Sequence, residues 1–92
     1  MDKYIIVGEY KDNGGTIYIS NTNPICWVQE ERLSKKYDSL IDAIHDIVNE
    51  YRIYRTTILC TDINYISILS LENRSITPVV NSEGELIDSD EF

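Results

Sequence analysis

Four carboxylates recur at every fourth residue in the middle of the chain. They are Asp38, Asp42, Asp46 and Glu50. On a helix, this spacing projects one carboxylate per turn, with successive groups roughly 5–6 Å apart along the axis. Like charges at this spacing slightly destabilise an isolated helix, and Asp is a mediocre helix former, so the row does not serve the helix itself. The pattern is typical of a solvated helix face, and it also fits a surface that pairs with the Lys and Arg side chains of a partner.

The last twelve residues carry a second group of acids. Residues 81–92 contain five acids and neither Lys nor Arg, whereas residues 1–80 hold eleven acids and eight bases, so the tail accounts for most of the formal net charge of −8. Because nucleic acids and anionic membranes both require a basic surface, this balance argues against either as a direct partner and favours basic proteins. The secondary partner-binding residues that we predict here are Glu83, Glu85, Asp88, Asp90 and Glu91.

No catalytic or metal-binding motif accompanies these acids. His45 is the only histidine, and it has no nucleophile in a recognisable motif beside it, which predicts a surface or boundary residue. The serines lack a GxSxG context, and Gly14-Gly15 lacks the flanking residues of a phosphate-binding loop. Cys26, Cys60 and His45 do not have zinc-site spacing, and the tail acids do not follow the calcium-loop pattern. We therefore predict a protein that is not an enzyme and holds neither a metal nor a cofactor.

Aromatic and guanidinium groups gather about fifty residues into the chain, where the acidic row ends. Tyr51 and Tyr54 alternate there with Arg52 and Arg55. This composition is found at protein interfaces and at small anionic ligand sites. Core packing accounts for Tyr51, which leaves Tyr54 as a candidate anchor for a partner.

The element that must position the acidic row is a helix over about residues 38–52. Ser39, with Asp42 three residues later, fits a looser capping box, and Asp38 is an alternative cap. The end of the helix is less well marked, because no Gly or Pro follows, and we place it near Arg52. The apolar side chains at helical spacing predict one buried side made of Leu40, Ile41, Ile44, Ile47, Val48 and Tyr51.

Short β-rich runs separated by turn residues surround this helix. Gly14-Gly15 predicts a hairpin, and Pro78 places the last run at a sheet edge, because proline cannot donate to the ladder. Hairpin-length connections imply mostly antiparallel pairing. The sequence therefore predicts the α+β class, as a small two-layer sandwich of one sheet and one main helix. The predicted strands cover residues 3–10, 16–20, 25–29, 56–61, 65–71 and 75–80.

The chain is predicted to form one α+β domain over residues 1–80, followed by an acidic C-terminal tail over residues 81–92. Trp27 is expected to pack in or against the core, and Cys26 and Cys60 are expected to be reduced and buried. No apolar run is long enough to span a membrane, and no secretory leader is recognisable. The expected location is the cytoplasm.

The first half of the chain has a recognisable layout. A strand at 3–7, a glycine-containing turn, a second strand and Trp27 lead into Tyr37-x-Ser39-Leu40-x-x-Ala43. Over roughly residues 3–52 this layout resembles short ββα proteins encoded by bacteriophages and mobile elements of low-GC bacteria. The resemblance implies that small acidic members inhibit host defences, including anti-CRISPR proteins that occupy a nucleic-acid-binding surface. It covers none of residues 53–92 and assigns no functional residue.

Together these observations predict a non-enzymatic, phage-type inhibitor of a host defence, acting in the host cytoplasm. Its expected partner is a basic protein, such as a nuclease or another nucleic-acid-binding effector. Two alternatives stay open: an immunity or antitoxin-like protein that neutralises a basic toxin, and an oligomeric sponge for a small ligand held by Arg52, Tyr54 and Arg55. A homodimer is compatible with each of them. The predicted partner-binding residues are Asp38, Asp42, Asp46, Glu50 and Tyr54.

Overall fold

The fold is seen in a computed structural model of the whole chain. For residues 51–59 and 63–64 only the backbone is described. The residues that the structure describes are 3–10, 15–21, 26–59, 63–80 and 87. In chain order the elements are β1 (Tyr4–Tyr10), β2 (Thr16–Asn21), β3 (Cys26–Val28), the short 3₁₀ helix η1 (Glu31–Leu33), α1 (Leu40–Leu59), β4 (Ile63–Ser70) and β5 (Ile76–Val80).

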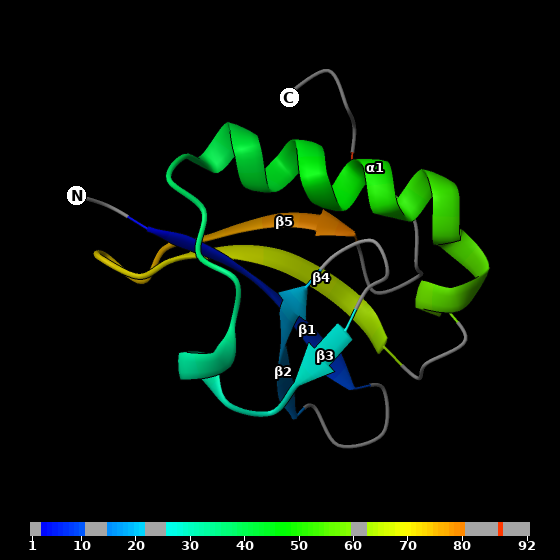
Figure 1. Cartoon of the computed structure of the whole chain (residues 1–92), viewed down its shortest axis with the longest axis horizontal. Coiled ribbons are helices and arrows are strands. Elements are labelled where there is room, and N and C mark those ends of the chain that lie inside the picture. The colour runs from blue at the N-terminus through cyan, green and yellow to red at the C-terminus, as the bar shows by residue number, and fades with distance from the viewer. Residues whose placement is uncertain (1–2, 11–14, 22–25, 60–62, 81–86, 88–92) are drawn as a thin grey trace.

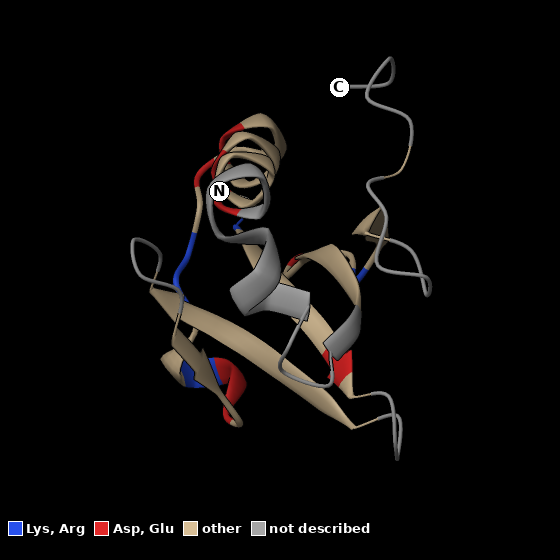
Figure 2. Cartoon of the chain, turned by 90° about the vertical axis from the view of Figure 1, so that its right-hand side faces the viewer, with Lys and Arg blue, Asp and Glu red and all other residues tan. Residues whose placement is uncertain are grey.

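The strands form one five-stranded sheet in the order β3-β2-β1-β4-β5 (Figure 1). Every neighbouring pair of these strands is antiparallel. The helix α1 packs against β4 and β1, and in the end-on view of Figure 2 it lies on one side of the sheet. The chain therefore has the predicted α+β class, with one main helix covering one face of an antiparallel sheet.

The hairpin and the edge strand follow their sequence signals. Val7 of β1 lies opposite Tyr18 of β2, and the Tyr10 amide donates a 2.9 Å hydrogen bond to the Gly15 carbonyl where the two strands separate. This confirms the hairpin. Pro78 lies in β5 at the edge of the sheet, as predicted.

The core fills the space between α1 and the sheet, and Trp27 is partly buried against it. In β1 the alternation of a strand points Ile6 toward α1 and its neighbours Ile5 and Val7 to the opposite face. The buried side chains of this core are Ile6, Ile17, Ile19, Tyr37, Ala43, Ile44, Ile47, Ile66, Ile68, Val79 and Val80.

The segment before α1 is fixed to the sheet by backbone hydrogen bonds. The Tyr37 amide donates to the Tyr4 carbonyl at 2.8 Å, and the Tyr4 amide returns a bond of 3.0 Å to the Tyr37 carbonyl. The Lys35 amide donates to the Ile19 carbonyl at 2.9 Å. These bonds determine where the chain leaves the sheet, and therefore where the helix begins.

Two sequence predictions about the second half are wrong. The helix continues to Leu59 rather than ending near Arg52, so the predicted strand over 56–61 is helical at least through Leu59. No Gly or Pro interrupts this stretch, and Ile47, Tyr51, Tyr54 and Ile58 continue the helical spacing. Extending an existing helix costs far less than starting one, and β-propensity depends strongly on context, so the β-branched residues are absorbed into the helix.

Two further findings concern the edge strands β3 and β5. Cys26 is a free, exposed cysteine in the three-residue edge strand β3, so its predicted burial is wrong; Cys60 lies outside the described residues. The last strand ends at Val80, where the tail was predicted to start. Beyond it, the Ile87 amide donates a 2.9 Å hydrogen bond to the Val79 carbonyl, so the chain returns to β5 at this residue.

Candidate functional site

The carboxylates from Asp38 to Glu50 do not share one face of α1. Each residue of a helix advances by about 100°, so a step of four residues overshoots a full turn by about 40°, and the two steps from Asp42 to Glu50 drift by about 80°. Asp38 and Asp42 are exposed, Asp46 is partly buried, and Glu50 retains only 2% exposure. The row therefore winds from the solvent side toward the core, and Glu50 is not accessible to a partner in this structure.

The exposed end of the acidic row lies at the N-cap of α1. The Ser39 hydroxyl accepts a 3.1 Å hydrogen bond from the Asp42 amide, and the Ser39 carbonyl accepts the amide of Ala43 at 3.3 Å. This confirms Ser39 as the N-cap. Just before the cap, the carboxylate of Asp38 pairs with the ammonium of Lys3, and the Asp38 side chain keeps 71% exposure.

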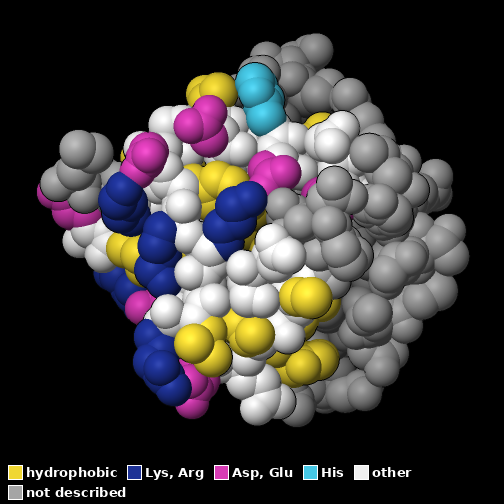
Figure 3. Space-filling model, viewed as in Figure 1, with side chains coloured by type: hydrophobic (Ala, Val, Ile, Leu, Met, Phe, Trp, Pro, Cys, Tyr) yellow, Lys and Arg dark blue, Asp and Glu magenta, His cyan; other side chains and the backbone are white. Residues whose placement is uncertain are grey.

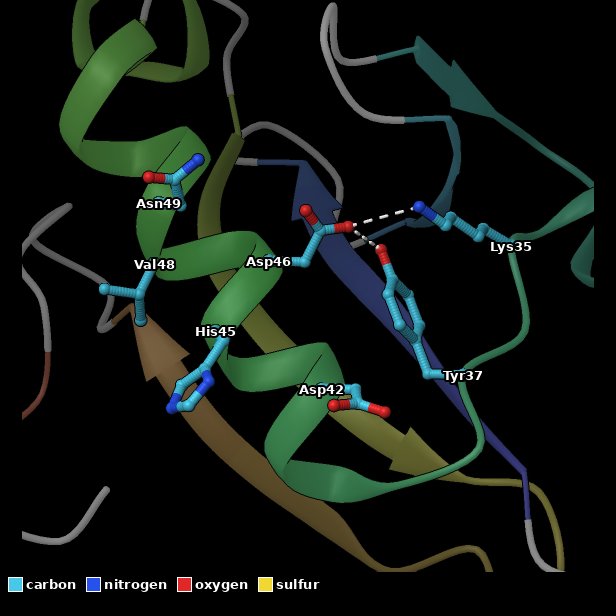
Figure 4. Close-up of a pocket in the computed structure, with 7 residues that line it drawn as sticks. All are labelled: Lys35, Tyr37, Asp42, His45, Asp46, Val48 and Asn49. Carbon is cyan, nitrogen blue, oxygen red and sulfur yellow. Dashed lines mark hydrogen bonds and ion pairs between the residues drawn. The ribbon is translucent and has the colours of Figure 1, made fainter.

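Asp46 is held by the segment that precedes the helix (Figure 4). One of its carboxylate oxygens accepts hydrogen bonds from the Tyr37 hydroxyl and from the Lys35 ammonium, the latter at 3.3 Å. The same ammonium lies 5.1 Å from the centre of the Tyr37 ring, within the range of a cation–π contact. Asp46 therefore ties α1 to the strand-like segment at 35–37 and serves the fold.

An open hollow of about 720 Å³ lies between α1 and this segment. Figure 4 shows Asp42 and Asp46 on the side of Tyr37, with His45 directed away from them. His45 is exposed, as the sequence predicted. Asp46 and Lys35 are paired with each other here, so Asp42 is the lining carboxylate that the hollow offers to a charged partner. The hollow is lined by Lys35, Tyr37, Asp42, His45, Asp46, Val48 and Asn49.

The sequence did not predict that the side of α1 carrying Ile41 is accessible. Ile41 was assigned to the buried side, but it is 48% exposed and directly precedes the exposed Asp42. It follows the well-packed position of Leu40 by one residue, which turns it about 100° away. A helical wheel places it on the flank of the apolar side, where burial depends on what the rest of the chain covers. We call the surface formed by Asp38, Ile41, Asp42, His45 and Asn49 the exposed helix face.

The positive charges of the described side chains are engaged within the fold. Figure 3 shows Lys and Arg side chains gathered with acids over the segment that leads into α1. The Lys36 ammonium donates to the carbonyls of Glu31, Arg32 and Ser34. The ion pairs are Lys3 with Asp38, Arg32 with Glu30, Lys35 with Asp46 and Arg74 with Glu31.

The pair between Arg74 and Glu31 joins distant parts of the chain. The two terminal guanidinium nitrogens of Arg74 donate to the two carboxylate oxygens of Glu31, at 3.4 and 3.0 Å. These hydrogen bonds, and then the attraction of the opposite charges, raise the pKa of Arg74 above its usual value, so the guanidinium is charged at any physiological pH. Arg74 has a positive φ of 62°, which the Asn73 side chain supports by accepting the Ser75 amide at 2.8 Å.

The remaining predicted site residues lie outside the described side chains. Tyr54, Arg52 and Arg55 fall on α1, for which only the backbone is described at these positions. The tail acids Glu83, Glu85, Asp88, Asp90 and Glu91 are not among the described residues. Their roles stay predictions from the sequence.

Among the described residues there is neither a metal-binding cluster nor a helix that could span a membrane. Across 3–10, 15–21, 26–59, 63–80 and 87, no three His, Cys, Asp or Glu side chains are grouped so that they could hold a metal ion. In the same part of the chain, no helix combines the length and the apolar character that crossing a membrane requires. Comparison with protein-family models, with curated proteins and with solved structures gives no match.

Proposed function

We propose that this chain is an acidic, non-enzymatic binding protein that presents its exposed helix face to the basic surface of a partner protein. The observation that carries the proposal is the distribution of charge. Every Lys and Arg whose side chain is described is engaged by the chain itself. The exposed acids Glu9, Asp42 and Glu72 have no ion pair recorded among the described residues, so the surplus of negative charge faces outward.

The exposed helix face combines this charge with an apolar contact. Ile41 directly precedes Asp42 in α1, and its aliphatic side chain is half exposed. Carboxylates set the orientation and the rate of association, whereas affinity depends mostly on a desolvated anchor. In this proposal Asp42 pairs with a cation of the partner and Ile41 fills a small apolar depression beside it.

The class of the partner follows from the sign and spacing of these groups. The exposed carboxylates of Asp38 and Asp42 can pair with Lys and Arg side chains that otherwise bind phosphates. A nucleic-acid-binding effector is therefore the first candidate, and inhibition of a host defence by a phage-type protein is the corresponding biological role. The role itself is supported only by the resemblance of residues 3–52. A basic toxin would present the same chemistry.

The proposal is tested by capture from a lysate of a candidate host, using the full chain as bait. Captured proteins are identified by mass spectrometry at low and at high salt. Wild-type bait should capture a basic nucleic-acid-binding protein that is released as salt rises. Duplex DNA added to the complex should displace the bait. The variants Asp42→Lys and Ile41→Glu should each reduce the capture at least tenfold.

Glu72→Lys is the matched control for net charge. Glu72 is an exposed acid in the turn between β4 and β5, on a different element from α1, and its reversal changes the net charge by the same amount as Asp42→Lys. Capture by this variant should match the wild type. If Glu72→Lys lowers capture as much as Asp42→Lys does, only overall charge matters and the proposed face is wrong.

A further inference from the structure

A groove of about 440 Å³ lies on the face of the sheet opposite α1. The alternation of the strands directs Val7 and Glu9 of β1 to this face, because Ile6 points into the core. The volume lies within the range of sites that bind small molecules. The groove is lined by Val7, Gly8, Glu9, Thr16, Tyr18, Glu31, Tyr65, Ser67, Leu69, Arg74 and Ile76.

Glu9 lies between two strands that each supply a tyrosine to the groove. In the ladder Glu9 is opposite Tyr65 of β4, and side chains in such a pair have Cβ atoms about 4.5–5.5 Å apart. Tyr18 of β2 is opposite Val7, so it is the diagonal neighbour of Glu9, at about 7–8 Å. Both tyrosines are partly exposed. The Glu9 carboxylate is therefore flanked by one phenol ring on each side of β1.

The charged groups of the groove leave one negative charge unbalanced. Arg74 donates to both carboxylate oxygens of Glu31, so this pair is satisfied within the chain and adds no net charge. Glu9 is exposed and takes part in none of the ion pairs recorded among the described residues. The unbalanced charge therefore lies at the end of the groove that Tyr65 borders.

The remaining lining of the groove is mainly apolar. Ile76 lies opposite Leu69 in the ladder and is 61% exposed, and Val7 lies between this rung and Glu9. A cation is attracted both by a carboxylate and by the faces of aromatic rings, whereas an anion in the same place would be repelled by Glu9. The groove therefore fits a ligand with a positive end and an apolar body.

We propose that this groove binds a small organic cation, in which an ammonium group is attached to an apolar or aromatic body. The ammonium pairs with Glu9 beside the Tyr65 ring, and the body lies over Val7 and Tyr18 toward Ile76. The net charge of −8 adds a long-range attraction for such a ligand. The groove and the exposed helix face are on opposite layers, so this inference does not depend on the proposed function.

Three probes of one shape test the proposal on the nitrogen-15-labelled full chain by two-dimensional nuclear magnetic resonance. They are 2-phenylethylamine, 2-phenylethanol and phenylacetate, which carry a positive charge, no charge and a negative charge near neutral pH. The amine should shift the amide signals of Val7, Gly8 and Glu9 more than those of α1. It should bind at least about fivefold more tightly than the alcohol, and phenylacetate should bind more weakly than the alcohol.

Two variants separate the charge from the ring. Glu9→Gln keeps the shape of the side chain and should abolish the preference for the amine, while the affinity for the alcohol stays within about twofold of the wild type. Tyr65→Leu keeps an apolar side chain without the ring and should weaken binding of the amine more than binding of the alcohol. Asp42→Asn removes an exposed carboxylate from the other layer, and this matched control should keep the full preference.

Four results would overturn the inference. The first is that no probe shifts the three amides at millimolar concentration. The second is that the amine and the alcohol bind the wild type equally well. The third is that the largest shifts fall on α1, and the fourth is that Glu9→Gln retains the preference for the amine. The same spectra show whether each variant is folded.

Discussion

The two ends of the acidic row on α1 are in opposite environments. Asp38 and Asp42 are exposed near the helix cap, and their side chains face solvent or an exposed lysine. Asp46 is hydrogen-bonded to Tyr37 and Lys35, and Glu50 is buried. One chemical group at one spacing therefore serves two purposes. Spacing determines the direction of a side chain on a helix, but the packing of the rest of the chain determines what that direction meets.

The largest expected effect on stability is at Glu50, the buried end of the acidic row. Glu50→Lys should lower the free energy of unfolding by about 3–5 kcal/mol, because it places the opposite charge in a site formed around a carboxylate. Denaturant titration followed by tryptophan fluorescence measures this. Asn49→Lys, at the neighbouring exposed position, should change the stability by no more than about 0.5 kcal/mol. Equal losses for the two variants would show that Glu50 is not buried in solution.

The hydrogen bond to Asp46 should have an intermediate effect. Tyr37→Phe and Asp46→Asn should each cost about 1–2 kcal/mol of stability, since the hydroxyl of a buried tyrosine donates to a carboxylate. In a double-mutant cycle the two losses should add to more than the loss of the double variant. Lys35→Met should cost less than about 1 kcal/mol, because the ion pair is partly exposed. Strict additivity of the two losses would exclude the contact.

The Ser39 cap, at the exposed end of the row, should contribute less to stability. Ser39→Ala removes the hydroxyl that accepts the Asp42 amide and should cost about 1 kcal/mol. Ser39→Asp restores an acceptor and should recover most of that loss. Thermal unfolding of the three proteins gives the comparison, and a Ser39→Ala variant as stable as the wild type would show that the cap contributes nothing.

The smallest effect on stability is expected at Asp42. Asp42→Lys should lower the free energy of unfolding by no more than about 1 kcal/mol, because the side chain is exposed and the change loses only its favourable position in the first turn of α1. Binding to a basic partner should fall at least tenfold in the same variant. A stability loss comparable to that of Glu50→Lys would remove the distinction between the two ends of the row.

Local signals in the sequence predicted much of this fold. Ser39 caps the helix, glycines accompany the first hairpin, and Pro78 lies in an edge strand. Each of these depends on backbone chemistry within a few residues, so neighbouring sequence contains the information. The same reasoning failed for residues 56–59. Their β-branched side chains favour a strand locally, but the continuing helix incorporates them.

Exposure was harder to predict than secondary structure. The sequence indicated that Ile41 is buried and that Glu50 is accessible. In the structure Ile41 is exposed and Glu50 is buried. A helical wheel places these two residues on opposite flanks of the apolar side, where burial depends on which flank the rest of the chain covers. The segment at 35–37 contacts the helix on the side of Asp46, and this contact joins residues that are 9 to 11 positions apart.

The sequence by itself determined the class of the fold, the cap of the helix and the excess of acid, because each follows from local backbone preference or from composition. Only the tertiary structure decided which carboxylates remain available to a partner and which are held by the fold. Those outcomes depend on contacts such as Tyr4 with Tyr37 and Glu31 with Arg74, whose members are far apart in the chain. Spacing along one element cannot encode them, since they arise from the packing of several elements at once.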